Sequence, residues 1–167
     1  MDIVKKTRPK IEDVIHLQLK SETKENALGF VTCLRENKMA PSWGYGSRNA
    51  NSNGKRICNI GVDEKGWRIM LCLDNIRTYE QTVLSEGLQE IIWKMMIYCQ
   101  KQTLGCGAGC RGQQLTIFGK DFNNLCYDKY VTLSRFWISI GNPDKEMVAA
   151  AIRLLELEQK TRKGMLD

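Results

Sequence analysis

Residues 54–73 have the sequence GKRICNIGVDEKGWRIMLCL, in which two runs of alternating side chains flank a short turn. Apolar residues occupy every second position from Cys58 to Val62 and again from Trp67 to Leu73. A period of two is typical of strands, and the glycine-containing turn between the runs predicts an antiparallel hairpin. We expect this hairpin to belong to an antiparallel sheet.

The segments on either side of the hairpin have helical and strand periodicities of their own. Apolar residues spaced three and four apart predict helices over residues 11–19, 23–38, 84–99 and 142–163. Alternation predicts two more strands, over residues 115–118 and 130–140. Thr23 and Asn142 are the expected N-caps of two of these helices. The sequence therefore predicts an α+β fold, a single domain in which a twisted antiparallel sheet of about four or more strands is packed by helices.

The composition is that of one globular domain. Of the 167 residues, 43% are hydrophobic and 26% are charged, and no linker or repeat divides them. We expect residues 1–10 to form a basic N-terminal arm and residues 11–164 to form a single α+β domain. No apolar run approaches the about 20 residues that cross a bilayer, and the N-terminus lacks the apolar centre of a secretory signal. We therefore expect a cytoplasmic protein without a membrane partner.

Four of the seven cysteines lie between residues 99 and 126, in a loop with the spacing C-x6-C-x3-C-x15-C and a dense run of glycines. In a reducing compartment such cysteines serve as core residues, metal ligands or redox groups more often than as disulfides. Four thiolates can close a tetrahedral zinc site, although zinc ribbons usually carry C-x2-C pairs that this loop lacks. We expect these four residues to lie close together as candidate zinc ligands: Cys99, Cys106, Cys110 and Cys126.

Two other interpretations of this loop stay open. Cys106 and Cys110 are a candidate redox pair, in which the charge of Arg111 would favour the thiolate. Alternatively, the thiols are packed without a chemical role, as we expect for Cys58 and Cys72 in the hairpin.

The sequence lacks the common catalytic signatures. Its one histidine, His16, excludes a metal site built from two histidines of one chain, and no H-E-x-x-H motif or phosphate-binding G-x4-G-K-[ST] loop is present. The acidic residues are scattered, as on a solvated surface. We therefore expect a binding protein rather than an enzyme.

Residues 40–54, APSWGYGSRNANSNG, form an expected loop of small and polar residues that carries Trp43 and Tyr45. Aromatic side chains in such a loop either cover the edge of the domain or rim a ligand site on the rigid frame. Together with Trp67 of the hairpin, they predict a partly apolar cleft. The ligand that we expect there is a small apolar or aromatic compound.

Nucleic-acid binding is the alternative function. The formal net charge is +6, much of it at the two ends of the chain, and Lys55, Arg56 and Arg68 add positive charge to the hairpin. Such an excess favours anionic partners. No DNA-binding helix-turn-helix or RNA-stacking signature accompanies it, so this alternative ranks second.

A pattern of short motifs runs through the second half of the chain, where the clustered cysteines are accompanied by TIFGKDF at residues 116–122 and NPD at residues 142–144. In this pattern, C…C-x3-C…FGK-x-F…C…NPD, the chain resembles small uncharacterised bacterial proteins. The resemblance covers residues 40–160 and implies a bacterial, cytoplasmic α+β domain. It implies no activity, ligand or cofactor.

Removal of zinc is the direct test of the cysteine loop. If the four thiolates hold the metal, native mass spectrometry will show the chain with one bound zinc ion. A chelator will remove the ion and lower the thermal stability, because metal binding contributes to folding. A mass equal to that of the bare chain, with unchanged thermal stability in chelator, would leave packed thiols or a disulfide.

Overall fold

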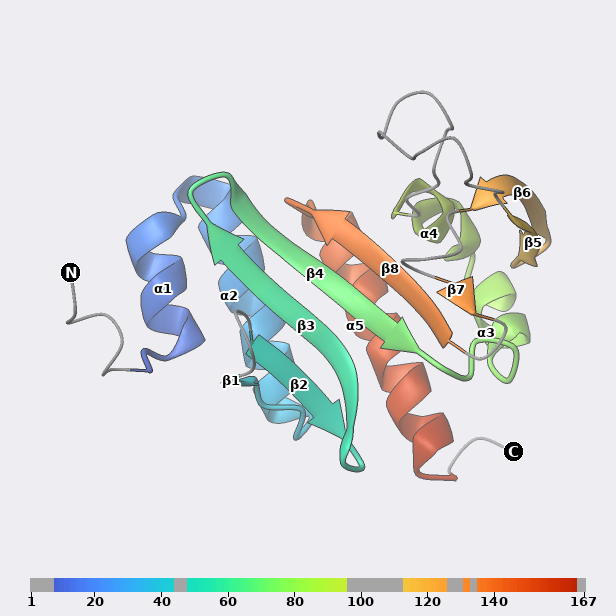
Figure 1. Ribbon diagram of the computed structural model, residues 1–167, viewed down its shortest axis with the longest axis horizontal. Helices are drawn as coiled ribbons and strands as arrows, with labels where there is room; N and C mark the ends of the chain where they lie inside the picture. Colours follow the sequence, from blue (N-terminus) through green and yellow to red (C-terminus); the bar gives the residue numbers. More distant parts are fainter. Residues whose placement is uncertain (1–7, 44–47, 96–112, 126–130, 133–134, 165–167) are drawn as a thin grey trace.

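The computed structural model of the protein describes residues 8–43, 48–95, 113–125, 131–132 and 135–164. Within these ranges the helices are α1 (Ile11–Gln18), α2 (Ser21–Glu36), α3 (Glu80–Ser85), α4 (Gln89–Met95) and α5 (Lys145–Arg162). The strands are β1 (Ser42–Trp43), β2 (Arg48–Ser52), β3 (Lys55–Asp63), β4 (Gly66–Leu73), β5 (Gln113–Ile117), β6 (Lys120–Leu125), β7 (Val131–Thr132) and β8 (Arg135–Gly141). Figure 1 shows how these elements are arranged.

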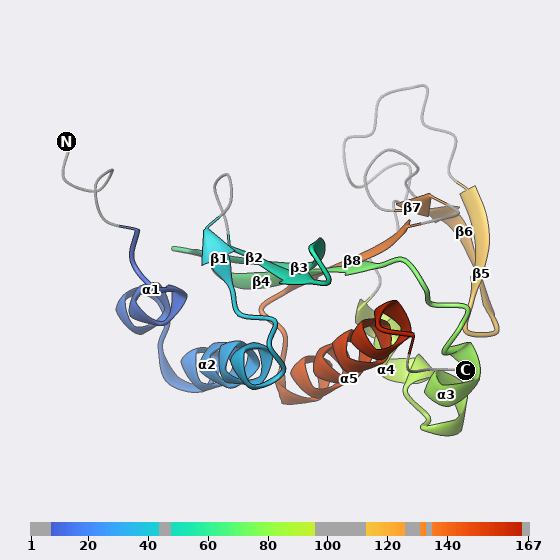
Figure 2. The same cartoon turned by 90° about the horizontal axis from the view of Figure 1, so that it is seen from below.

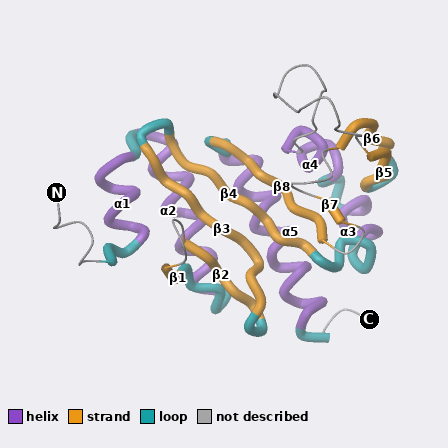
Figure 3. The backbone as a smooth tube through the Cα atoms, viewed as in Figure 1, coloured by secondary structure: helices purple, strands orange, loops and turns teal. Residues whose placement is uncertain are grey.

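The hairpin expected from the sequence lies at the centre of the larger sheet. β3 pairs with β4 in an antiparallel register that places Ile60 opposite Ile69 and Cys58 opposite Leu71. β2 and β1 extend the sheet on one side and β8 and β7 on the other, so the strand order is β1-β2-β3-β4-β8-β7. β5 and β6 pair separately, beside α4 (Figure 3). The expected α+β fold, with an antiparallel sheet packed by helices, is confirmed.

The longer helices lie on one face of this sheet. In the view from below, α1, α2 and α5 form a layer beneath the strands (Figure 2). Along β4 the apolar Trp67, Ile69 and Leu71 are buried, whereas Arg68 between them is exposed. No described helix covers the face to which Arg68 belongs. The core therefore occupies the space between the sheet and a single layer of helices.

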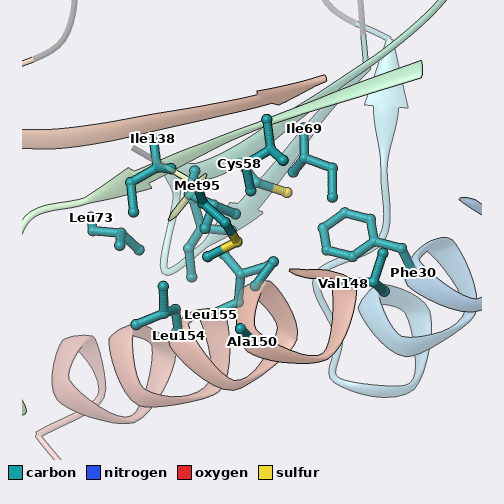
Figure 4. Packing of buried hydrophobic residues seen from close by; sticks show 14 of the residues in the cluster. Phe30, Cys58, Ile69, Leu73, Met95, Ile138, Val148, Ala150, Leu154 and Leu155 are labelled. Atoms are coloured by element: carbon teal, nitrogen blue, oxygen red, sulfur yellow. The ribbon is translucent and has the colours of Figure 1, made fainter. Parts of the chain in front are cut away.

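This core is apolar and closely packed. Figure 4 shows Cys58, Ile69 and Ile138 of the sheet meeting Leu154 and Leu155 of α5 between the two layers. Full burial of an isoleucine or leucine side chain stabilises a protein by about 1.5–3 kcal/mol relative to exposure. Burial of these residues is therefore the main force that holds α5 against the central strands.

β1 and β2 lie in the segment that we expected to be a loop. β2 has the sequence RNANS, in which no apolar alternation marks a strand. Its pairing with β3 shifts between Ala50 and Asn51, which leaves Ile57 without a partner in the register. This bulge allows Ile57 and its neighbour Cys58 both to enter the core.

The prediction of one helix over residues 84–99 was wrong in its extent, because α3 and α4 are separate helices that cover residues 80–85 and 89–95. Gly87 lies between them in the left-handed region, with φ 68°. The N–H of Leu88 donates to the carbonyl of Val83 at 3.1 Å, and the N–H of Gly87 donates to that of Leu84 at 3.2 Å. This pair of bonds is the Schellman motif, which ends a helix. The strand expected over residues 130–140 is likewise divided, into β7 and β8.

The two expected helix caps were also wrong. Thr23 lies inside α2, and the cap of α5 is Asp144, whose carboxylate accepts from the N–H of Met147 at 2.9 Å. Asn142 instead bonds to the start of β4. Its side-chain oxygen accepts from the N–H of Trp67 at 3.0 Å, and its own N–H donates to the carbonyl of Trp67 at 2.7 Å.

Gly66 makes this contact sterically allowed. Its φ is 130°, and a Cβ atom there would lie 1.9 Å from the side-chain oxygen of Asn142. Since a residue with a side chain does not fit, Gly66 fixes the turn between β3 and β4 against the connection from β8 to α5.

Candidate functional site

The site residues expected from the sequence fall into two groups. Five of them lie outside the described residues: Tyr45, Cys99, Cys106, Cys110 and Cys126. The zinc site and the redox pair therefore stay predictions. Within the described residues, no group of three or more histidine, cysteine or acidic side chains is arranged to hold a metal ion. The remaining two site residues, Trp43 and Trp67, are described.

Trp67 lies in the core. It is 2% exposed, and its ring centroid is 6.0 Å from that of Phe30 in α2, in a tilted arrangement. The indole N–H of Trp67 is also buried, with no hydrogen-bond partner among the described residues. Packing against Phe30 accounts for this side chain without a ligand, and the ligand-binding role expected for it stays a prediction.

Trp43 lies at the edge of the sheet and is 41% exposed. The register pairs it with Arg48 on the neighbouring strand, so the two side chains lie next to each other. The guanidinium carbon of Arg48 is 3.7 Å from the centroid of the indole ring, which is the stacked geometry of a cation–π contact. One face of the indole is thus occupied by a cation.

Arg48 itself is only 9% exposed. Its Nη2 donates to the carbonyl of Pro9 at 3.0 Å, while its Nε is buried without a hydrogen-bond partner. Burial lowers the pKa of the Arg48 guanidinium, because desolvation disfavours the charged form. Within the described part of the chain, no carboxylate forms an ion pair with it. The edge therefore holds a nearly buried positive charge beside an exposed indole.

Trp43 and Trp67 belong to the same face of the sheet but lie far apart on it. Trp43, Arg48, Ile60 and Ile69 stand opposite one another on four neighbouring strands, β1 to β4. Trp67 lies on β4, two residues from Ile69. β4 is three strand spacings away from β1, the strand of Trp43, and these three spacings add up to about 14 Å. A ligand that touched both tryptophans would have to span that distance.

The residues of the alternative function lie on the helix-free face and its border. Lys55 and Arg56 are exposed at the start of β3, and Arg68 is exposed on β4. The Arg68 side chain crosses over Gly61, where an added Cβ would lie 2.8 Å from its Nε. Its guanidinium is 3.7 Å from the carboxylate of Asp63, and both side chains are more than half exposed. Screening by solvent makes this ion pair weak, so the charge of Arg68 is accessible to an anion.

The cysteines of the hairpin are packed thiols, as the sequence predicts. Cys58 is fully buried in the core and Cys72 is nearly so. Burial raises the pKa of both thiols, and at Cys72 the positive charge of Arg56 opposes this effect without reversing it. Both are therefore protonated near neutral pH and poor nucleophiles.

A second polar cluster, around Glu158 of α5, was not anticipated. Its carboxylate is fully buried and accepts hydrogen bonds from backbone N–H groups of Asp74 and Asn75, the Asn75 side chain, the Tyr79 hydroxyl and Nε of Arg162, at 2.9–3.2 Å. Burial, together with the charge of Glu158, raises the pKa of Tyr79. Five donors fill the acceptor sites of one carboxylate, so this cluster has a structural role.

Arg162 completes the cluster. Its guanidinium also donates to the carbonyls of Lys55, Arg56 and Cys72, at 3.0–3.3 Å. It thereby joins the C-terminal part of α5 to the start of β3 and the end of β4.

Comparison of the chain with protein-family models, with curated proteins and with solved structures finds no match. The candidate site therefore rests on the geometry of this protein alone. Among the described helices, none has the length and apolar character needed to cross a bilayer.

The Glu158 cluster leads to a prediction about stability. Replacement of Glu158 by alanine leaves the buried Arg162 with Asp74, at 3.4 Å, as its remaining carboxylate and leaves the donors around Glu158 without their acceptor. Removal of one partner from a buried ion pair costs about 3–5 kcal/mol. Glu86→Ala is the matched control, because Glu86 pairs with Arg153 where both side chains are about one-third exposed. We expect Glu86→Ala to lower the free energy of unfolding by less than about 1 kcal/mol. Chemical denaturation of both variants measures the difference, and equal losses would contradict a structural role for the cluster.

Proposed function

We propose that this protein is a non-enzymatic binding protein that holds a small aromatic ligand against Trp43 at the β1–β2 edge of its sheet. The observation that carries the proposal is the Trp43–Arg48 stack. Among the side chains whose burial the structure describes, which do not include those of residues 113–115, 123–125, 131–132 and 135–137, Trp43 and Leu17 are the only large apolar ones that are exposed. Of the two, Trp43 alone belongs to the sheet.

The stack favours binding for a physical reason. A ring held against a guanidinium group loses little further freedom when a second ring packs on its other face, so the entropy cost of binding is reduced. Aromatic pairs in offset or edge-to-face contact contribute about 0.5–1.5 kcal/mol beyond the area that they bury. The apolar part of the ligand supplies this contact. The zinc site of the cysteine loop remains a separate part of the proposal, with the test given above.

The test follows the indole N–H signals of the tryptophans by NMR during titration with a library of small aromatic compounds. The signal of Trp43 is assigned from its loss in Trp43→Phe. We expect at least one compound to shift this signal with saturation, and Trp43→Ala to abolish its binding. Leu17→Ala is the matched control, because it removes the other exposed apolar side chain. Saturable binding that survives in Trp43→Ala, or the absence of any binding, would overturn the proposal.

The second candidate function is nucleic-acid binding by the helix-free face. The observation that favours it is the exposed position of Arg68 on this face, with Lys55 and Arg56 exposed at its border. Contacts from arginine and lysine to phosphates provide affinity without requiring a sequence-specific signature.

Salt dependence tests this second function. In filter binding to single-stranded DNA and RNA, the association constant should fall about tenfold or more between 50 and 200 mM salt. Arg68→Gln should lower the slope of log K against log salt by about 0.7, the contribution of one phosphate contact to a single strand. Arg77→Gln is the control, because Arg77 is exposed outside the sheet. Equal slopes for the two variants would exclude Arg68 from such an interface.

A further inference from the structure

The connection between α1 and α2 contains a residue in a backbone conformation that its side chain disfavours. Ser21 has φ 50°, in the left-handed region, which costs free energy in a residue that carries a Cβ atom. The two residues before it, Leu19 and Lys20, are extended, with φ −102° and −129°. The return of the chain from α1 into α2 therefore depends on the turn at Ser21.

No local hydrogen bond accounts for this conformation. Within the described part of the chain, the N–H of Ser21 donates to no backbone carbonyl, and α2 begins without a side-chain cap. Lys38, at φ 59°, differs because it ends α2: its N–H and that of Met39 donate to carbonyls of the last turn at 3.1 and 2.7 Å. The strain at Ser21 is thus offset by the packing of α1 rather than by the turn itself.

α1 lies at the end of the helix layer, where it packs against α2 and β3 (Figure 1). Ile15 on its inner side is fully buried. On its flank, Nε and Nη2 of Arg35 donate to the two carboxylate oxygens of Glu12. Before the helix, the carbonyl of Pro9 accepts from Arg48. Each of these contacts joins a residue that precedes the connection to one that follows it, or to the core, so α1 of a second copy could make the same contacts.

We propose that two copies of this chain exchange α1, so that the helix of each copy packs against α2 and β3 of the other. The exchanged dimer keeps the contacts of α1, and Ser21 is free to leave the left-handed region. Leu17, which is 84% exposed two residues before the connection, lies where the two copies meet and becomes covered.

The exchange also has a consequence for the β1–β2 edge. Because Pro9 precedes α1 and moves with it, the carbonyl bonded to Arg48 comes from the second copy. Each edge is then completed by the other chain. This inference does not depend on the ligand proposed for Trp43.

Substitutions at Ser21 test the exchange in opposite directions. Proline fixes φ near −65°, which suits the first turn of α2 and an extended Lys20 but not the closed connection. Ser21→Pro should therefore raise the fraction of dimer. Ser21→Gly removes the strain of the closed form and should weaken dimerisation about tenfold or more. Lys38→Gly is the matched control, because it relieves a similar φ outside the connection and should leave dimerisation unchanged.

Size-exclusion chromatography with light scattering, over a range of protein concentrations, measures the dimer. A natural chain that stays monomeric at millimolar concentration would overturn the inference. A dimer that Ser21→Gly and Ser21→Pro affect no more than Lys38→Gly would also overturn it.

A charge exchange shows whether the dimer forms through α1. Glu12→Arg and Arg35→Glu each place like charges where the natural chain has an ion pair. In an exchanged dimer with one copy of each variant, opposite charges face each other at both contacts. After joint refolding, we expect the mixed dimer to form about fivefold or more tightly than either variant forms a dimer alone. The double variant, with both substitutions in one chain, should behave like the natural protein.

The charge exchange also separates this dimer from other associations. A mixture without preference for the mixed dimer would mean that the copies meet through another surface, and the inference would fail. If Ser21→Pro does not fold, Ser21→Gly and the charge exchange still decide the question. None of these measurements uses a ligand, so their outcome leaves the proposed function to its own test.

Discussion

The buried carboxylate of Glu158 is the interaction on which the arrangement of sheet and helices depends most directly. It accepts five hydrogen bonds, two of them from the backbone that follows β4, and one of its donors, Arg162, continues to carbonyls of β3 and β4. Apolar burial holds α5 against the sheet but does not fix how far the helix slides along it, because the hydrophobic effect has no direction. The Glu158 bonds do have direction, so they set the position of α5 and of the chain that leaves β4.

The one-sided packing of the sheet gives the protein two kinds of surface that differ in chemistry. The helix-free face carries Arg68, which is exposed across Gly61, and an extended anionic partner is proposed for this face. The β1–β2 edge is different, because there an exposed indole covers a guanidinium that is almost removed from water. The proposed small ligand contacts the exposed indole at that edge, which a polyanion on the helix-free face would not reach.

The sequence predicted the helices and strands that hydrophobic periodicity determines. It failed where the conformation or the contacts of a single residue determine the structure. The central hairpin and α5 follow from apolar alternation and helical spacing. β2, RNANS, carries no such pattern because it pairs at the sheet border through its backbone, and Gly87 divides the expected long helix through a φ that only local bonding reveals. Trp67 continues the apolar face of Ile69 and Leu71, a signal that already favoured the core. Glu158 and Arg162 continue the buried face of α5 at helical spacing, so they could have been recognised as a buried pair. Nothing in the sequence distinguishes Arg48 from an exposed loop arginine.

Arg48 and Arg162 differ in how far the fold compensates their buried charges. The Arg162 side chain is 6% exposed, and its guanidinium reaches two carboxylates and three carbonyls, so the cost of its desolvation is offset by the fold itself. Arg48 is 9% exposed, with one carbonyl and one indole face in place of a carboxylate. Replacement of a poorly compensated buried charge by an apolar side chain is often neutral or stabilising. Stability alone therefore does not account for an arginine at position 48, and its place beside an exposed aromatic ring supports the proposed binding site at the β1–β2 edge.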